Sequence, residues 1–175
     1  RAWLIDDLNG IGGLRLADAP DPAPQPHEVV LQVHYAALNP ADRYLAESQY
    51  PAQPPLPHIL GRDGMGTVIE VRSEVKDVRV GERRAILRGE AGGNRPGTFA
   101  QRVAVPTQSL VEIPAGWSDQ EAAGAALVYL TAFLLPTSWL IALAAPKTRN
   151  VDDLCTVMFS SGSTGEPKGV MLSHH

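Results

Sequence analysis

The sequence predicts a mainly β fold with short helices, in which the strands form a small, partly open barrel. Short runs of β-branched and aromatic residues recur over the first hundred positions, and turn residues separate them at the spacing typical of barrels and sandwiches. Helix signals occur around positions 39–46 and from position 119. After these, an apolar helical segment is expected to lead into a truncated strand, glycine-rich loop and strand.

Six strands are expected in the first part, at positions 2–5, 14–16, 29–35, 64–71, 84–87 and 99–105. Two adjacent glycines mark the turn between the first two strands, and four prolines between positions 20 and 26 make an extended connector before the third. A second proline cluster at 51–57 and a glycine-rich stretch at 90–97 are expected to be loops. Alternate residues of the third strand are expected to share one face, namely Val29, Leu31, Val33 and Tyr35.

Both helices begin at recognisable signals. Asn39 is a suitable cap for the first helix, which has a proline at its first position. The second is expected to begin at Asp119, because Ser118 and Glu121 have the spacing of a capping box, and to end near Leu135, since a proline follows. Residues 122–146 carry no charge, so a membrane span there is the alternative to two apolar helices placed end to end.

The composition excludes several function classes. With 44% hydrophobic and 19% charged residues the chain is an ordinary globular sequence, and a net charge of −4 without basic clusters argues against nucleic-acid binding. The single cysteine, Cys155, excludes an internal disulfide and a thiolate zinc cluster, which favours a reducing, cytoplasmic setting. Because the chain begins without Met and without a signal pattern, we expect a piece of a longer reading frame.

The first part resembles a known enzyme family through motifs that occur in the family's order. These are EVVLQVHYAALNPADRYL (28–45), PHILGRDGMGTVIEV (57–71), GERR (81–84), GTFAQRVAVP (97–106) and AALVYLTAF (125–133). They are similar to the GroES-like catalytic domain of the medium-chain dehydrogenase/reductase family, in its zinc-free quinone oxidoreductase branch. The resemblance covers about residues 1–134, which we take as the first domain.

The resemblance implies a metal-free site. Zinc-dependent relatives place a cysteine where this chain has Asn39 and a histidine where it has Arg62, and neither replacement ligates Zn²⁺. It further implies that Asn39, Tyr44 and Thr131 lie on the nicotinamide side and that Tyr50 is catalytic. A short amide, phenols and a hydroxyl can hold a carboxamide and polarise a carbonyl without metal. The alternative is structural: a helix cap, an ordinary helix residue and two half-buried tyrosines.

The family's cofactor is held on a nucleotide-binding domain whose first turn reads G-x-G-x-x-G. That motif is absent from the sequence: Gly10-Ile11-Gly12 lacks the third glycine, and Gly64 and Gly66 lie in an expected strand. The resemblance implies NADPH as cofactor and a small-molecule quinone or enone as substrate. We expect no reductase turnover from this polypeptide, because the half that binds the nucleotide is missing from it.

The last part carries a different motif, TVMFSSGSTGEPKGVMLSH (156–174). A glycine-, serine- and threonine-rich turn after a strand offers free backbone N–H groups to phosphate oxygens. The motif resembles the phosphate loop of AMP-binding, adenylate-forming enzymes such as acyl-CoA and acyl carrier protein synthetases. The resemblance covers about residues 135–175 and implies ATP binding by Ser160, Ser161, Gly162, Ser163, Thr164, Gly165 and Lys168. The alternative is a β-hairpin with a polar tip.

Three functional hypotheses follow. The first is a fragment of a zinc-independent, NADPH-dependent oxidoreductase of the quinone or enone reductase type, joined to the start of an adenylation domain and inactive by itself. The second is an ATP-dependent acyl-activating ligase with an N-terminal fusion. The third is a non-catalytic, stable barrel from a chimeric or truncated reading frame. The sequence does not indicate an oligomeric state.

Overall fold

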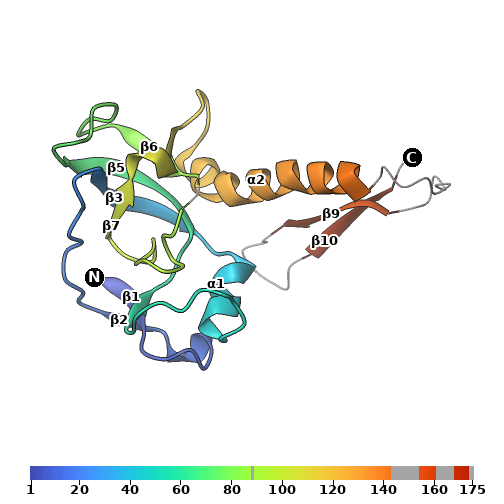
Figure 1. The fold of residues 1–175 in the computed structure, drawn as a ribbon, viewed down its shortest axis with the longest axis horizontal. Helices are drawn as coiled ribbons and strands as arrows, with labels where there is room; N and C mark the ends of the chain where they lie inside the picture. Colours follow the sequence, from blue (N-terminus) through green and yellow to red (C-terminus); the bar gives the residue numbers. More distant parts are fainter. Residues whose placement is uncertain (88, 143–153, 161–167, 174–175) are drawn as a thin grey trace. The chain divides into compact units, whose positions relative to one another are not determined.

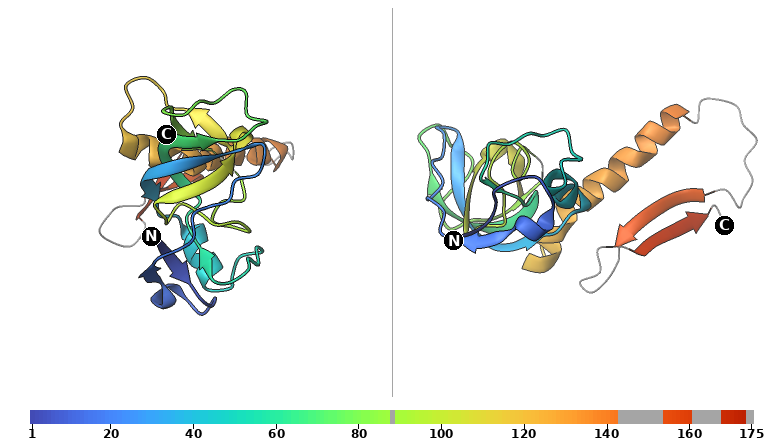
Figure 2. Two further views of the ribbon diagram at one scale, coloured as in Figure 1. Left: turned by 90° about the vertical axis from the view of Figure 1, so that its left-hand side faces the viewer. Right: turned by 90° about the horizontal axis from the view of Figure 1, so that it is seen from below.

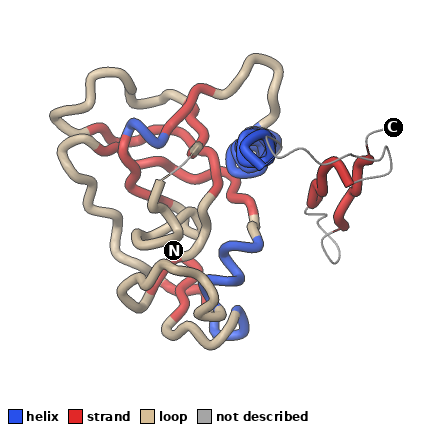
Figure 3. Tube along the Cα trace, turned by 45° about the vertical axis from the view of Figure 1, so that its right-hand side comes forward, coloured by secondary structure: helices blue, strands red, loops and turns tan. Residues whose placement is uncertain are grey.

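The computed structural model describes residues 1–87, 89–142, 154–160 and 168–173 of the chain. These residues belong to two compact units, Arg1–Leu127 and Val128–His175, coloured from blue to red in Figure 1. The first unit contains two antiparallel sheets, two short 3₁₀ turns (Ile11–Gly13 and Thr107–Ser109) and long connecting loops, drawn in tan in Figure 3. The expected division at residue 134 stays a prediction.

The larger sheet of the first unit has five strands in the order β7-β3-β5-β6-β8. Their bounds are β3 Glu28–Ala37, β5 Asp63–Val71, β6 Arg83–Ile86, β7 Arg102–Pro106 and β8 Leu110–Glu112. The smaller sheet has the order β2-β1-β4, with β1 at Ala2–Ile5, β2 at Arg15–Ala17 and β4 at His58–Ile59. All six expected strands of this part are therefore present within three residues of their expected starts, whereas β4 and β8 were not expected. The described ladders do not pair β7 with β8, so the partly open barrel stays a prediction.

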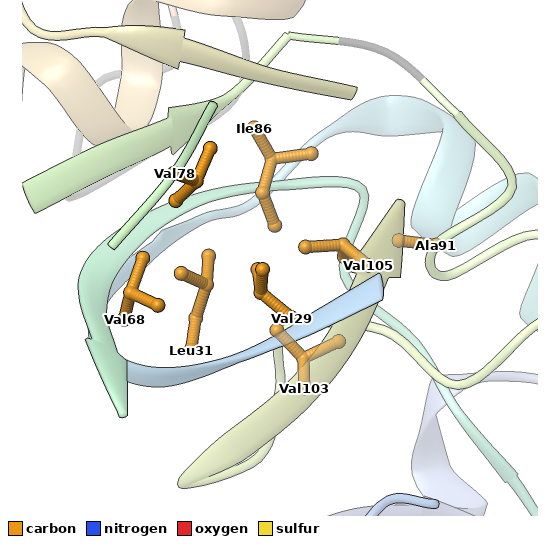
Figure 4. Close-up of a cluster of buried hydrophobic side chains, with 8 residues drawn as sticks. All are labelled: Val29, Leu31, Val68, Val78, Ile86, Ala91, Val103 and Val105. Atoms are coloured by element: carbon orange, nitrogen blue, oxygen red, sulfur yellow. The ribbon is translucent and has the colours of Figure 1, made fainter. Parts of the chain in front are cut away.

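The principal core lies against the larger sheet. Figure 4 shows eight buried side chains that converge from β3, β5, β6, β7 and two loops: Val29, Leu31, Val68, Val78, Ile86, Ala91, Val103 and Val105. Each Val, Leu or Ile that is fully buried contributes about 1.5–3 kcal/mol to folding. This cluster explains why the β-branched runs of the sequence form strands.

One expectation about β3 is wrong. Val29 and Leu31 are completely buried, but Tyr35 is exposed. The register with β5 shifts between Val33, which pairs with Gly66, and Tyr35, which pairs with Met65. Two residues of β3 there oppose one of β5, and such a bulge breaks the alternation of faces.

Helix α1 (Pro40–Ala46) begins after Asn39, as expected. Its residues Leu45 and Ala46 pack with Ile5 of β1 and with Leu60. Helix and smaller sheet therefore lie side by side, which Figures 1 and 2 both show. This packing places the start of α1 beside the segment that precedes β5.

Helix α2 (Asp119–Ala142) begins where the capping box predicts. The hydroxyl and the N–H of Ser118 both bond the Glu121 carboxylate at 2.8 Å. The expected end near Leu135 is wrong, because one helix continues through Pro136. A proline inside a helix removes one intrahelical hydrogen bond and crowds the preceding turn, which costs free energy, but α2 is not interrupted there. Among the described residues, no helix combines the length and the apolar character that crossing a membrane requires.

The second unit contains a two-stranded antiparallel ladder of β9 (Leu154–Ser160) and β10 (Lys168–Ser173). Ser160 pairs with Lys168, so β9 and β10 flank the glycine-rich segment of the motif as the strands of a hairpin would. The loop residues of the expected phosphate site lie outside the described residues; they are Ser161, Gly162, Ser163, Thr164 and Gly165.

Candidate active site

The site is built around Asn39, the residue that precedes α1. Its backbone N–H donates to Asp42 Oδ2 at 2.9 Å, which closes the first turn of the helix. Its side-chain Nδ2 donates to Asp63 Oδ2 at 3.3 Å, and Asp63 begins β5. Asn39 therefore connects the first turn of α1 with Asp63 of β5, which is 24 positions away in the sequence.

Asp42 and Asp63 are both almost fully buried, at 4% and 2% exposure. Burial raises the pKa of each carboxyl to about 6. Hydrogen bonds oppose this rise: Asn39 and the Gly61 N–H, which is 3.2 Å from Asp42 Oδ1, lower the pKa of Asp42. The positive charge of Arg62 also lowers the pKa of both carboxyls. At neutral pH both groups are mainly ionised.

Arg62 directly precedes Asp63 in the sequence motif Gly61-Arg62-Asp63. The carbon at the centre of its guanidinium is 4.8 Å from the centroid of the Tyr50 ring, which is cation–π contact distance. Its Nη1 is buried and has no hydrogen-bond partner among the described residues. Tyr50 itself is half-buried and packs against the cluster formed by β1 and α1.

The segment that carries Arg62 is shaped by glycines. Gly61 has φ +102° and Gly92 has φ +66°, conformations that favour glycine. A Cβ atom on Gly92 would overlap the carbonyl oxygen of Gly61, so the 89–97 loop approaches this segment more closely than a side chain allows. The Thr98 hydroxyl then donates to the Asp63 carbonyl at 2.7 Å and fixes the start of β5.

The structure unites some of the residues expected from the sequence and separates others. Asn39 and Tyr50 are both joined to the Arg62 segment. Tyr44 is exposed on α1, with 48% of its surface accessible. Thr131 is exposed on α2, within the second unit. Ser160 and Lys168 occupy the facing ends of β9 and β10.

Sequence reasoning missed the two buried carboxylates. The signal was present, because Asp42 and Asp63 belong to the same motifs as Asn39 and Arg62, but an aspartate in such a motif reads equally well as a helix cap or a turn residue. His58 is buried on β4, where desolvation lowers its pKa. Among the described residues, no three His, Cys, Asp or Glu side chains gather as a metal site would require, and the absence of zinc stays a prediction.

Two surface pockets of the first unit lie elsewhere. One, of about 240 Å³, is bordered by the 19–22 connector and by Gln101 and Arg102. The other, of about 440 Å³, is bordered by Arg83, Arg84 and the 112–117 segment. Neither includes Asn39, Tyr50 or Arg62, so the candidate site lies apart from both pockets.

Residues 25–115, slightly more than half of the chain, match the family described as the alcohol dehydrogenase GroES-like domain. This chain belongs to that family. The GroES-like character expected for the first part is thereby confirmed. This GroES-like chain is similar to three proteins of known name.

The human synaptic vesicle membrane protein VAT-1 homolog is 34% identical over 133 residues, which are 73% of this chain and 32% of that protein. The chloroplastic NADPH-dependent alkenal/one oxidoreductase of Arabidopsis thaliana is 31% identical over 137 residues, or 75% of this chain and 36% of that protein. The crystal structure of the Pseudomonas syringae quinone oxidoreductase has a TM-score of 0.70 and 31% identity, and the likeness covers 78% of this chain and 41% of that one.

The chain therefore spans between about a third and two fifths of the length of these relatives. The similarities support the oxidoreductase part of the expectation, at the level of the medium-chain family. None of them supports the AMP-binding fragment expected at 135–175.

Proposed function

We propose that the first unit is the catalytic domain of an NADPH-dependent oxidoreductase that reduces a quinone or an enone without zinc. The observation that carries this proposal is the cluster around Arg62. At the two positions where the resemblance places zinc ligands, the chain has an amide held by Asp63 and a guanidinium stacked on Tyr50. These groups bind and polarise oxygen atoms of small molecules, which is the task of a metal in a zinc-dependent relative.

Asn39, Tyr44 and Thr131 are proposed to face the nicotinamide, and Tyr50 is proposed to act on the substrate side. Asn39 keeps unused hydrogen-bonding capacity, because its Nδ2 has two N–H groups and one of them serves Asp63. Tyr44 is exposed and available to a bound molecule. When bound, NADPH supplies the hydride, and the residues of this unit orient the acceptor. The names of the plant and Pseudomonas relatives agree with this substrate class.

A chimera tests the proposal directly. Residues 1–134, which include Thr131, would be placed ahead of the nucleotide-binding part of the Pseudomonas syringae quinone oxidoreductase, and NADPH oxidation would be followed with a quinone as acceptor. We expect turnover that a strong zinc chelator does not reduce. The 175-residue chain assayed alone is expected to show none, since it contains no G-x-G-x-x-G turn.

Two results would contradict the proposal. A chimera with a cooperative thermal unfolding transition and no quinone-dependent NADPH oxidation would exclude the activity. Turnover that disappears with the chelator and returns with zinc would exclude the metal-free mechanism. The unaltered Pseudomonas enzyme, carried through both assays, is the matched control.

A second candidate function is ATP-dependent acyl activation by an AMP-binding fragment at 135–175. It is supported by the motif at 156–174 and by the ladder that pairs Ser160 with Lys168 at the two ends of the glycine-rich segment. In this proposal Ser160, Lys168 and the intervening residues contact the phosphates of ATP. Pyrophosphate release from ATP in the presence of a fatty acid is the test, with a Lys168→Ala chain as control. An equal release from both chains, or none from either, would contradict this function.

A further inference from the structure

Arg62 carries a charge that no described residue neutralises by direct contact. Its Nη1 is buried without a hydrogen-bond acceptor among the described residues, and its guanidinium lies over the face of the Tyr50 ring and near Gly93. The other half-buried arginines among the described residues, Arg84 and Arg95, each form an ion pair with glutamate. Leaving a buried donor unsatisfied costs about 1–3 kcal/mol, and more when the group is charged. A ligand atom that reaches the guanidinium would supply the missing acceptor.

The residues on both sides of Arg62 are fixed. Gly61 donates its N–H to Asp42, and Asp63 accepts hydrogen bonds from Asn39 and Thr98. The Tyr50 ring restricts the guanidinium from one face. The side chain is nevertheless partly exposed. A cation held in this way is preorganised for an acceptor atom, so little rotamer entropy is lost on binding.

The neighbouring charges select the kind of acceptor. Asp42 and Asp63 are buried close enough to Arg62 for its charge to act on both carboxyls. Both carboxyls already interact with the charge of Arg62. A neutral carbonyl oxygen, which needs only an N–H donor, therefore suits the site better than a carboxylate or phosphate, whose full charge would lie near two buried carboxyls.

We propose that Arg62 binds the carbonyl oxygen of a neutral quinone or enone and polarises it for reduction. This inference rests on the proposed oxidoreductase function and assigns its substrate-binding group. A hydride from bound NADPH would form a new bond to the conjugated system and displace an electron pair toward the carbonyl oxygen, where the guanidinium N–H would donate. A proton from water then completes the hydroquinone or the saturated ketone. Arg62 itself transfers no proton, because guanidinium stays protonated in proteins.

The test uses the full 175-residue chain and does not depend on turnover. Tetramethyl-1,4-benzoquinone would be titrated into isotope-labelled protein, and the dissociation constant and the shift of the Arg62 Nε–H signal would be measured by NMR. The methyl groups prevent addition of Cys155 to the quinone ring. We expect Arg62→Met to weaken binding about tenfold or more, as the loss of a charged hydrogen bond does.

Two further variants separate contact from fold. Arg43→Met is the matched control, since Arg43 is exposed on α1 and pairs with Glu47; its dissociation constant is expected to equal that of the wild type. Arg62→Lys keeps the charge and loses the planar guanidinium, so quinone binding is expected to weaken by an intermediate factor. This variant replaces Arg62→Met if the Met variant does not unfold cooperatively. Benzoate is the anionic probe and is expected to bind more weakly than the quinone.

Several outcomes would overturn the inference: no saturable quinone binding by the wild type, an unchanged dissociation constant in both Arg62 variants, or tighter binding of benzoate. The same substitution in the chimera separates this inference from the function. If the chimera is active and Arg62→Met changes neither its kcat nor its KM, the role of Arg62 is refuted and the oxidoreductase function stands. An inactive chimera with Arg62-dependent quinone binding refutes the function and supports the binding site.

Discussion

Asp63 is an ionisable side chain in the protein interior, where burying a charge costs free energy. It is 2% exposed at the start of β5, and its carboxylate accepts a hydrogen bond from Asn39. Burial outweighs that hydrogen bond and the attraction of Arg62, so the pKa of Asp63 stands at about 6 instead of 3.8. The residue is therefore retained at a cost in stability, which is common where a carboxylate positions functional groups.

The raised pKa gives the stability a defined pH dependence. Between about pH 4 and pH 6 the folded chain binds a proton at Asp63 that the unfolded chain has released, so the contribution of Asp63 to stability falls as the pH rises through this window. Asp63→Asn removes the titration and keeps a side-chain oxygen for Asn39. We expect the stability of the variant relative to wild type to increase from pH 4 to pH 7, by up to about 3 kcal/mol.

Urea unfolding of both chains at a series of pH values measures this difference. Taking the difference cancels the opposite trend of His58, whose pKa is lowered by burial. A difference that stays constant over the whole range would show that Asp63 is not buried in its charged form.

Loop contacts that only glycine permits govern the position of the Arg62 segment. Gly92 has φ +66° and lies against the backbone of Gly61. Gly92→Ala adds a methyl group in a strained conformation and forces the two segments apart. We expect the free energy of unfolding to fall by about 2–4 kcal/mol.

Gly81→Ala is the matched control, because Gly81 also has a positive φ of +92° but has open space around it. Its cost is expected to be about 1 kcal/mol, from backbone strain alone. Equal losses in the two variants, measured by urea unfolding, would mean that the approach of Gly92 to Gly61 is not important.

The start of α2 depends on a reciprocal cap. Ser118 and Glu121 exchange hydrogen bonds of 2.8 and 3.3 Å between side chain and backbone. Ser118→Ala is expected to lower the free energy of unfolding by about 1 kcal/mol, whereas Ser118→Thr retains a hydroxyl that can donate and accept and is expected to stay near wild type. Thermal unfolding followed by circular dichroism measures both. Identical midpoints for the Ala and Thr variants would exclude the cap.

At the scale of the whole molecule, the first unit contains three buried apolar clusters of its own. Its strands must open before a protease can cut them. We expect limited trypsin digestion to leave a resistant fragment that contains residues 1–127, identified by mass spectrometry and still showing a cooperative transition. Early cleavage after Arg84 in β6 or after Arg102 in β7 would contradict an independently stable first unit, and with it the third hypothesis, a stable barrel without activity.

The sequence by itself determined the local features of this protein. These features are the strand positions, the start of α1 after Asn39 and the capping box of α2. They depend on the conformational preferences of residues that are neighbours in the sequence. Three features needed the tertiary structure: the bulge that exposes Tyr35, the continuation of α2 past Pro136, and the burial of Asp42 and Asp63 around Arg62. The physical reason is that burial and register arise from contacts between segments far apart in sequence, such as Asn39 with Asp63 and Gly61 with Gly92. An aspartate has the same local pattern whether it caps a helix in water or holds an amide in the interior, and only packing distinguishes the two.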